Sequence, residues 1–348
     1  MAINKRFFLT LSGENISLSK FEILSLFKLK NTNVSNVRLI DRLLILSSKK
    51  NISKYIASRA ALTHDISELV IESSIEENDI INSLKNIDFI KYIENKKSFA
   101  VRIQKIGHKN INSEYFEKLI GKIIFGSIKK TLKVDLLHPD ILFYGIFAKN
   151  KFFFGINNSK KIRSCFKSNS LKSRPFFHPS ALNPRLARVM VNLSQIKEDE
   201  IFLDPFCGTG SLLIEAFLIG CNQVIGIDIS PKMINGAKKN LKKFGVKNME
   251  LLVGDSNHIP LKFISGIATD PPYGRSSSTY KKSLIPLLEN FFLEISDLIL
   301  KNRLITIALP SYIKLFELID KLYFEIKHEF TQYVHSSLTR KIYVIQKK

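Results

Sequence analysis

From residue 201 onward, short apolar runs alternate with amphipathic stretches, and this alternation constrains the fold more than any other feature of the chain. The amphipathic stretches follow helical patterns, and the apolar runs have the length of buried strands. Such an alternation predicts an α/β fold with a doubly wound parallel sheet. The expected strands are residues 201–204, 223–229, 249–255, 266–270 and 304–309. Two final segments, FEIKHEFTQYV and TRKIYVIQ, have no helix between them, so they predict an antiparallel pair that completes the sheet.

The front half of the chain is organised differently. KRFFLTLS, SLSKFEILSLFK and NVRLIDRLLILSS predict a strand, a helix and a strand. Further on, SFAVRIQ, a helix-like segment, KVDLLHPD, ILFYGIFAK and KFFFGINN predict a second unit of helix and sheet. We therefore expect two small α/β units ahead of the parallel sheet.

The positive charge of the chain is concentrated in this front half. The formal net charge is +22, and residues 1–180 contain 31 basic and 15 acidic residues, against 22 and 16 in the remainder. This distribution indicates a polyanionic partner and a basic binding module ahead of a more neutral one. Since 45% of the residues are hydrophobic, the chain is expected to fold and not to remain disordered.

Residues 158–177, NSKKIRSCFKSNSLKSRPFF, separate the two halves and contain no acid. Composition alone favours a solvated linker, whereas the concentration of charge in the front half favours a linker that also contacts phosphate. On the second interpretation, the candidate phosphate-binding residues are Lys160, Lys161, Arg163, Lys167 and Lys172.

The three cysteines, Cys165, Cys207 and Cys221, form neither a disulfide framework nor a metal-type pair, and we expect no metal site. The N-terminus lacks the apolar core of a signal peptide, and no apolar run approaches the roughly 20 residues that span a bilayer. These features predict a reduced, cytoplasmic protein that does not bind a membrane.

DPFCGTGS, residues 204–211, follows an expected strand and opens an expected helix, which is the context of a nucleotide-binding turn. Gly208 and Gly210 permit positive φ and allow a ligand to approach the backbone. The spacing is not GxGxxG and no GK[ST] follows, so dinucleotide and triphosphate sites are disfavoured.

Three acids lie at the ends of three successive expected strands: Asp204, Asp228 and Asp255. The first would repel a phosphate, the second is placed to accept from ribose hydroxyls, and the third from an adenine amino group. Together the three acids favour a ligand that is a nucleoside with a positive charge and no phosphate. S-adenosylmethionine has these properties. The alternative, in which each aspartate only caps a helix, explains each acid singly but not the series.

The fourth expected strand ends in Asp270-Pro271-Pro272-Tyr273. Two prolines exclude a helix interior and a central strand, so this stretch is rigid. The exocyclic amine of a nucleobase is a poor nucleophile because its lone pair is delocalised into the ring. Hydrogen-bond acceptors on its two N–H bonds would favour a tetrahedral nitrogen whose lone pair can attack the methyl group. Asp270 and the Pro271 carbonyl can be those acceptors. Tyr273 can stack on the base. We interpret the stretch as a clamp for an amino-bearing base; the alternative is a rigid turn without chemistry.

A carboxylate matches guanine, whose N1–H and N2 amine are adjacent donors, better than it matches adenine. Methylation at cytosine C5 would need a cysteine in this loop, and there is none. Arg275 follows the clamp and is either part of a polar loop or a contact to an RNA phosphate or the guanine O6.

These residues resemble a known family. DPFCGTGSLLIEA and DPPYGRSSS resemble the Rossmann-fold methyltransferases that modify guanine N2 in RNA, and among them the archaeal tRNA guanine-10 N2-methyltransferases with a THUMP domain. RPFFHPSALNPRLARVMVNL, HSSLTRKIYVI and KVDLLHPDILFYGIFAKNKFFFGI are similar to further segments of that family. The resemblance covers the chain from about residue 98, and residues 1–75 match only in general shape.

The resemblance implies a Rossmann-fold class I methyltransferase domain preceded by an α+β ferredoxin-like unit and a THUMP domain. The expected divisions are a ferredoxin-like unit at 1–70, a THUMP RNA-binding domain at 71–157, a basic linker at 158–177 and the methyltransferase domain at 178–348. It also implies tRNA as partner, S-adenosylmethionine as donor, and one or two methyl groups on guanine N2. A small activating subunit is left open, and we expect a monomer.

The resemblance assigns roles to individual residues. Asp204, Gly208 and Gly210 would line the methionine side of the cofactor, Asp228 its ribose and Asp255 its adenine. Asp270, Pro271, Pro272 and Tyr273 would hold the base. Arg174, His178 and Pro179 would close over the cofactor, although Ser180 departs from the glycine expected after HP.

Three other functions compete with this interpretation. A ribosomal RNA guanine-N2 methyltransferase would share the THUMP domain, but the HPSALNPRLAR segment favours tRNA. Adenine-N6 methylation of DNA is disfavoured by Asp270. A non-catalytic tRNA-binding scaffold would not need acids at four strand ends.

Overall fold

The computed structural model describes residues 4–107, 110–128, 132–157, 166, 170–273, 281–319, 322–336 and 338–348. The chain divides into two compact units. The first unit is formed by Met1–Lys20, Lys30–Ser58 and Thr63–Ile162, and the second by Phe21–Leu29, Arg59–Leu62 and Arg163–Lys348. Two short segments of the front half therefore belong to the unit that contains the C-terminal half.

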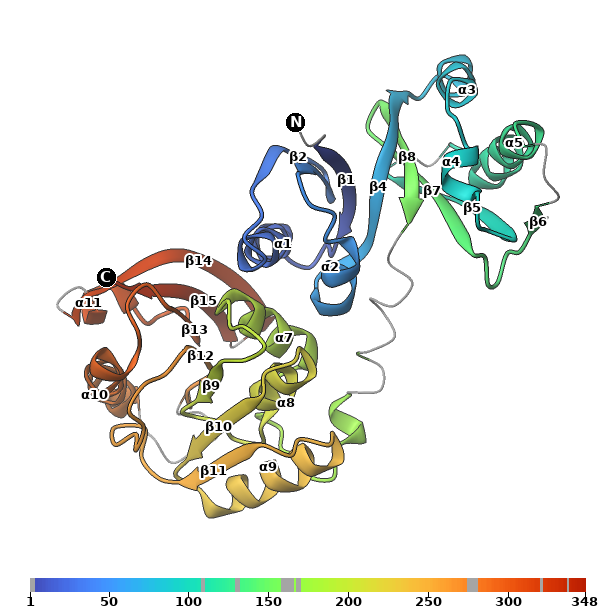
Figure 1. The fold of residues 1–348 in the computed structure, drawn as a ribbon. Helices are drawn as coiled ribbons and strands as arrows, with labels where there is room; N and C mark the ends of the chain where they lie inside the picture. Colours follow the sequence, from blue (N-terminus) through green and yellow to red (C-terminus); the bar gives the residue numbers. More distant parts are fainter. Residues whose placement is uncertain are drawn as a thin grey trace. The chain divides into compact units, whose positions relative to one another are not determined.

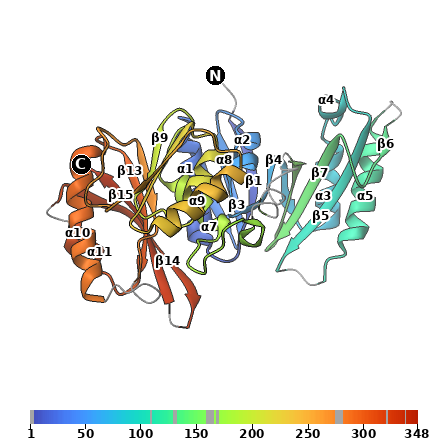
Figure 2. The same ribbon diagram turned by 90° about the horizontal axis from the view of Figure 1, so that it is seen from below.

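The first unit is built on an eight-stranded sheet (Figure 1). Across the sheet the strands are β2 (Val34–Ile40), β3 (Leu43–Ser48), β1 (Lys5–Leu11), β4 (Thr63–Ser74), β8 (Lys151–Asn157), β7 (Ile141–Ala148), β5 (Ser98–Ile106) and β6 (Lys133–Val134). β5 pairs in parallel with β6 and β7, and the remaining pairs are antiparallel. The helices α3 (Glu77–Lys85), α4 (Ile90–Ile93) and α5 (Ser113–Gly126) share a hydrophobic core with β5, β7 and β8, and Figure 2 shows them beside these strands.

The two α/β units expected in the front half share this one sheet. They are joined because β4 is 12 residues long and pairs with β1 on one side and with β8 on the other. Residue 70, the expected division between them, lies inside β4. A hydrophobic period of two predicts where a strand lies, but it does not say which neighbours pair with it.

The second unit contains a seven-stranded sheet. Across the sheet the strands are β11 (Met249–Val253), β10 (Gln223–Asp228), β9 (Ile201–Asp204), β12 (Gly266–Thr269), β13 (Leu304–Pro310), β15 (Leu338–Lys347) and β14 (Phe324–His335). The first five strands run parallel, and β15 is antiparallel to both β13 and β14. The predicted parallel sheet with a closing antiparallel pair is confirmed.

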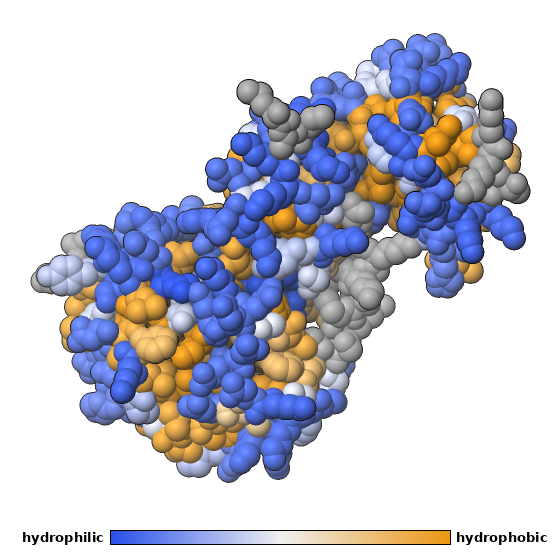
Figure 3. Space-filling model, in the orientation of Figure 1, coloured by the Kyte–Doolittle hydropathy of each residue, from blue (hydrophilic) through white to orange (hydrophobic). Residues whose placement is uncertain are grey.

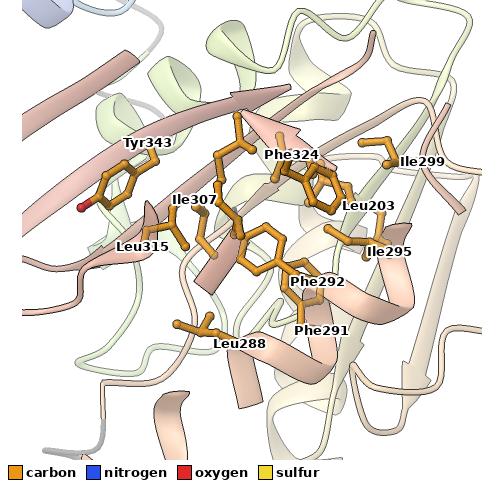
Figure 4. Packing of buried hydrophobic residues seen from close by; sticks show 14 of the residues in the cluster. Leu203, Leu288, Phe291, Phe292, Ile295, Ile299, Ile307, Leu315, Phe324 and Tyr343 are labelled. Atoms are coloured by element: carbon orange, nitrogen blue, oxygen red, sulfur yellow. The ribbon is translucent and has the colours of Figure 1, made fainter. Parts of the chain in front are cut away.

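Helices cover both faces of this sheet (Figure 1). On one side lie α7 (Pro184–Leu193), α8 (Ser211–Leu218) and α9 (Pro231–Lys243), and on the other α10 (Lys281–Leu298) and α11 (Leu315–Ile319). Figure 4 shows Phe291 and Phe292 of α10 among the buried side chains of the second face, with Leu203, Ile307 and Phe324. Burial of each of these aromatic side chains stabilises the fold by about 1.5–3 kcal/mol.

A buried polar network joins the two front-half segments to α7 within the second unit. Glu22 is fully buried and accepts hydrogen bonds from the amides of Ala61 and Leu62, each at 2.9 Å, and from Asn192 Nδ2 at 2.7 Å. Arg59 donates from Nε to Asn192 Oδ1 at 2.9 Å. Burial raises the pKa of Glu22, and these donors oppose the rise. The segments are found in α1 (Ile16–Leu29) and at the end of α2 (Ser53–Arg59).

The surface mixes hydrophilic and smaller hydrophobic areas on each unit (Figure 3). Exposed apolar side chains include Ile229 and Val253, at or just after the carboxyl ends of β10 and β11. Among the described helices, none is long and apolar enough to cross a membrane. Within the described ranges, no group of three or more His, Cys, Asp or Glu side chains is arranged as a metal site.

Candidate active site

The candidate site lies at the carboxyl edge of the second sheet, where β9 and β12 are neighbours. From β9 the chain continues to β10 and β11 on one side, and the strands that follow, β12 and β13, lie on the other. In open α/β sheets, ligands bind at this point of divergence. Asp204 ends β9, and Asp270 directly follows β12. Two of the acids predicted from the sequence therefore lie at this edge.

Asp204 is the most deeply buried of these acids. It is 2% exposed, and its Oδ1 accepts from Thr269 Oγ1 at 2.8 Å and from the Phe206 amide at 3.2 Å. Burial raises the pKa of Asp204 to about 7, and the carboxylates of Asp270 and Asp228 add to the rise. A cation placed at this edge of the sheet would be stabilised by the negative field of the three acids.

The glycine turn has the backbone conformation that its sequence predicts. Gly208 and Gly210 have φ of 50° and 82°, and Gly210 is the residue immediately before α8. The amide of Gly208 donates to Asp228 Oδ2 at 2.9 Å. Asp228 thus holds the turn as well as ending β10, and the Ser230 amide donates to its Oδ1 at 2.9 Å. Each carboxylate oxygen can accept a second bond, so these contacts leave acceptor capacity for a ligand.

Asp255 follows β11 and is exposed, and it accepts a hydrogen bond from the amide of Asn257 at 3.0 Å.

Cys207 is 5% exposed, and burial raises the pKa of its thiol well above the usual range. Its sulfur lies 2.9 Å from the position that a Cβ on Gly226 would occupy, so β10 needs a glycine there. Cys207 is thus a small buried packing residue and not a nucleophile.

Residues 174–177 lie against the glycine turn and α9. Asn240 of α9 is fully buried and makes three bonds: Oδ1 accepts from the Phe176 amide at 2.9 Å, and Nδ2 donates to the carbonyls of Phe176 at 2.9 Å and Thr209 at 3.0 Å. The ring of Phe176 packs on Gly236, where an added Cβ would be only 2.0 Å from a ring carbon. This contact fixes the segment beside the turn.

Arg174 brings a buried positive charge to the start of α8. It is 6% exposed and donates from Nη1 to Ser211 Oγ at 2.6 Å. Burial lowers the pKa of the Arg174 guanidinium, and Glu215 opposes this. Glu215 itself forms a buried ion pair with Arg188, at 2.7 Å. This cluster contains two guanidinium groups and one carboxylate, so its net charge is positive. Within the described residues, Arg174 Nε and Nη2 are buried without a hydrogen-bond partner.

The other residues predicted near the cofactor make fewer contacts. His178 Nδ1 bonds Ser180 Oγ at 2.7 Å, so the serine that departs from the expected glycine holds the histidine ring. Pro179 and Lys172 are exposed. Lys160, Lys161, Arg163, Lys167 and Arg275 lie outside the described residues.

The clamp residues meet a side chain from β15. The Tyr273 hydroxyl donates to Asp270 Oδ1 and also lies 3.3 Å from the Ala308 carbonyl of β13. Arg340 Nη2 is 3.8 Å from Asp270 Oδ2, and its guanidinium lies 5.5 Å from the centre of the Tyr273 ring. Burial raises the pKa of Asp270, whereas Arg340 and Tyr273 lower it. Pro271 is buried and Pro272 is exposed.

Three residues at the site were not singled out from the sequence: Asn240, Gly236 and Ile229. Arg340, in HSSLTR, could from the sequence either face the site or be solvated, and the structure places it beside Asp270. Ile229 is 76% exposed although it directly follows Asp228, and an apolar side chain after a strand-end acid is a signal that sequence alone contains. Asn240 and Gly236 look like ordinary helix positions in PKMINGAKKNLKK, and only the contact with Phe176 distinguishes them.

Two family models match the chain. One, described as an RMKL-like methyltransferase domain, matches residues 172–342, and the other, described as a DNA methylase, matches residues 44–239. The first range contains both the glycine turn and the clamp. The second ends before Asp270, so it does not include the residues that would select the base.

Curated archaeal proteins match over nearly their whole length. The tRNA (guanine(10)-N2)-dimethyltransferase of Methanothermobacter thermautotrophicus is 33% identical over 97% of this chain and 98% of its own length. The enzyme of the same name from Methanocaldococcus jannaschii is 34% identical over 97% of this chain and 98% of its own length. A solved methyltransferase structure in complex with SAH shares the fold, with a TM-score of 0.54 and 16% identity over 100% of this chain and 99% of that chain. At this identity and over this coverage, the chain belongs to the family of archaeal tRNA (guanine(10)-N2)-dimethyltransferases.

Proposed function

We propose that the protein transfers methyl groups from S-adenosylmethionine to the exocyclic N2 of guanine 10 in tRNA and that it adds two of them. The observation that carries this proposal is the contact of Asp270 with Tyr273 and Arg340, close enough to Asp204 for the two carboxylates to influence each other. A base-binding group and a site for a positively charged nucleoside share one edge of the sheet.

The residues present fit S-adenosylmethionine, which supplies an electrophilic methyl group when it is bound. The two unpartnered nitrogens of Arg174 suit the methionine carboxylate, and Gly208 and Gly210 let it approach the backbone. Asp204 would stabilise the positive charge. Asp228 would accept from the ribose, Asp255 from the adenine amino group, and Ile229 offers an apolar surface to the adenine ring. His178 and Pro179 would cover the cofactor.

The clamp residues would activate the amine. Asp270 accepts one N–H of N2 and the Pro271 carbonyl accepts the other, which draws the lone pair out of the ring. Tyr273 holds the base by stacking, and the rest of the catalysis is alignment of the amine with the methyl group. Asp270 would then take the proton that the methylated amine loses. Pro272, next in the chain, keeps the backbone of the clamp rigid.

The first unit would bind the RNA. Its ferredoxin-like part and THUMP domain, with the basic linker of Lys160, Lys161, Arg163, Lys167 and Lys172, would contact phosphates, and Arg275 would do so beside the base. Extraction of a stacked guanine costs a few kcal/mol, which these contacts would offset. Action on tRNA supports a cytoplasmic location, and we propose that the protein is a monomer.

Methyl transfer from labelled S-adenosylmethionine to an unmodified tRNA transcript, followed by nucleoside analysis, tests this function. The wild-type enzyme should produce N2-methylguanosine and then N2,N2-dimethylguanosine, and Asp270→Ala should produce neither. Asp297→Ala, which removes an exposed acid from α10, is the matched control and should remain active.

A second transcript with adenine at position 10 tests the target. Loss of methylation supports position 10, and continued methylguanosine would assign another guanine. Methyladenosine from either transcript would overturn the argument from Asp270, and binding of tRNA without transfer would favour a scaffold or a missing subunit.

A further inference from the structure

Arg340 lies beside the clamp without forming part of the DPPY sequence. It is paired with Pro310 of β13 and with Gln332 of β14, at the carboxyl edge of the sheet where Asp270 follows β12. Its side chain is 11% exposed and that of Asp270 is 15% exposed. Antiparallel pairing of β15 with β13 brings a residue from the end of the chain to the active-site edge.

Among the described residues, Arg340 is the cation that faces Asp270. Burial raises the pKa of Asp270, and the Arg340 guanidinium and the hydrogen bond from Tyr273 oppose that rise. The carboxylate of Asp270 also acts on Asp204, whose pKa it helps to raise. Arg340 supplies a cation at 3.8 Å from Asp270 Oδ2. An arginine keeps its charge when it is buried, so it can hold Asp270 as a carboxylate in this acidic surrounding.

The guanidinium is incompletely bonded. The 3.8 Å separation from Asp270 is an ion-pair distance and exceeds that of a hydrogen bond. Within the part of the chain that the structure describes, Arg340 Nε is buried without a hydrogen-bond partner. A buried donor without an acceptor costs free energy, so an acceptor on a ligand would complete this site.

The Watson–Crick edge of guanine presents the complementary pattern, with the donors N2–H and N1–H beside the acceptor O6. Arginine is the side chain that most often reads the acceptors of guanine in nucleic acids. We propose that Arg340 donates to O6 of the target guanine while Asp270 accepts from its amine, an inference that rests on the proposed function. The pair would reject adenine because adenine has an amine where guanine has O6.

The experiment compares guanine with 2-aminopurine at position 10 of the tRNA transcript. 2-Aminopurine keeps the 2-amine and lacks both O6 and the N1–H donor, so recognition of O6 is read from the part of the preference that Arg340→Met removes. The enzymes are wild type, Arg340→Met and Arg340→Lys, and kcat/KM is measured for both transcripts. We expect wild type to prefer guanine by about tenfold to hundredfold. Arg340→Met should lose most of that preference because its rate falls on guanine more than on 2-aminopurine, and Arg340→Lys should recover part of it.

The fluorescence of 2-aminopurine, which rises when the base leaves its stack, shows whether each variant still extracts the base. An equal rise with wild type and Arg340→Met would show an intact pocket. If Arg340→Met then slowed both transcripts by the same factor, Arg340 would only support Asp270 and Tyr273, and recognition of O6 would be wrong. If wild type failed to methylate the guanine transcript at all, the proposed function would fail and this inference with it.

Discussion

On the β9–β10–β11 side of the site, the acids are held mainly by the main chain, whereas on the β12–β13–β15 side they are held by side chains. Asp228 accepts from the amides of Gly208 and Ser230, and Asp255 accepts from that of Asn257. Asp270 instead depends on the Tyr273 hydroxyl and the Arg340 guanidinium. The backbone hydrogen bonds of the first side form as soon as the local turns form. The side-chain contacts of Asp270 require distant parts of the chain to pack together, and the charged groups there can still bind a substrate.

The buried cluster beneath the glycine turn tests how far the first side depends on charge. Glu215→Gln would leave Arg188 and Arg174 buried without their carboxylate, so we expect a loss of about 3–5 kcal/mol in the free energy of unfolding. Denaturant unfolding measures it. Glu250→Gln, which neutralises an acid on β11 bonded at the surface to Gln223, is the control and should cost far less. Equal losses in the free energy of unfolding for the two variants would mean that the buried ion pair contributes no more to stability than the surface contact.

The two sides should separate in steady-state kinetics. Asp270→Asn should lower kcat by about 10²- to 10³-fold, the cost typical of losing a group that stabilises the transition state. Asp228→Asn should chiefly raise KM for S-adenosylmethionine, because that residue holds the turn and the ribose. If both variants changed the same kinetic constant, kcat or KM, the proposed division between a catalytic side and a cofactor-binding side would be wrong.

Gly236→Ala tests the contact that holds residues 174–177 on the first side. The new methyl group would overlap the Phe176 ring, so the segment must shift, at a cost of about 1–3 kcal/mol. Binding of S-adenosylhomocysteine by calorimetry should weaken accordingly. Gly254→Ala is matched to it, because its Cβ would meet only Ile227 at 3.7 Å, and it should bind normally.

The smallest expected effect is a pH dependence of the free energy of unfolding that arises from Asp204. Its pKa of about 7 in the folded protein exceeds the usual 3.8, so the folded state binds a proton more tightly than the unfolded chain does. Stability should therefore rise as pH falls, by about 1 kcal/mol from pH 8 to pH 6, and Asp204→Asn should remove this increment. Identical pH slopes in wild type and variant would show that the carboxyl ionises normally.

The sequence predicted the side of the site that depends on local patterns. Asp204 and Asp228 could be placed at the sheet edge because carboxyl ends of parallel strands meet there, and Gly208 and Gly210 because positive φ favours glycine. The position of Asp270 after its strand could be predicted in the same way, but its side-chain partners could not. The packing of Phe176 on Gly236 could not be predicted, since it joins residues 60 positions apart that carry no local signal.

Long-range pairing explains the other differences. From HSSLTR alone, Arg340 could face the active site or be solvated, and only the pairing of β15 with β13, which puts it opposite Pro310, decides between the two. The same limit applies to the first unit, where the length of β4 joins strands that the sequence assigned to two units. The THUMP and ferredoxin-like assignments, and the domain limits built on them, stay predictions.

The short segments at Phe21–Leu29 and Arg59–Leu62 have an evolutionary consequence. Phe21 packs on His328 and Phe330, and Glu22 bonds to Asn192, so pieces encoded early in the gene complete a structure encoded late. End-to-end recombination at the basic linker would separate these pieces from their partners. A chimaera of this enzyme would therefore have to carry residues 21–29 and 59–62 along with its new catalytic half.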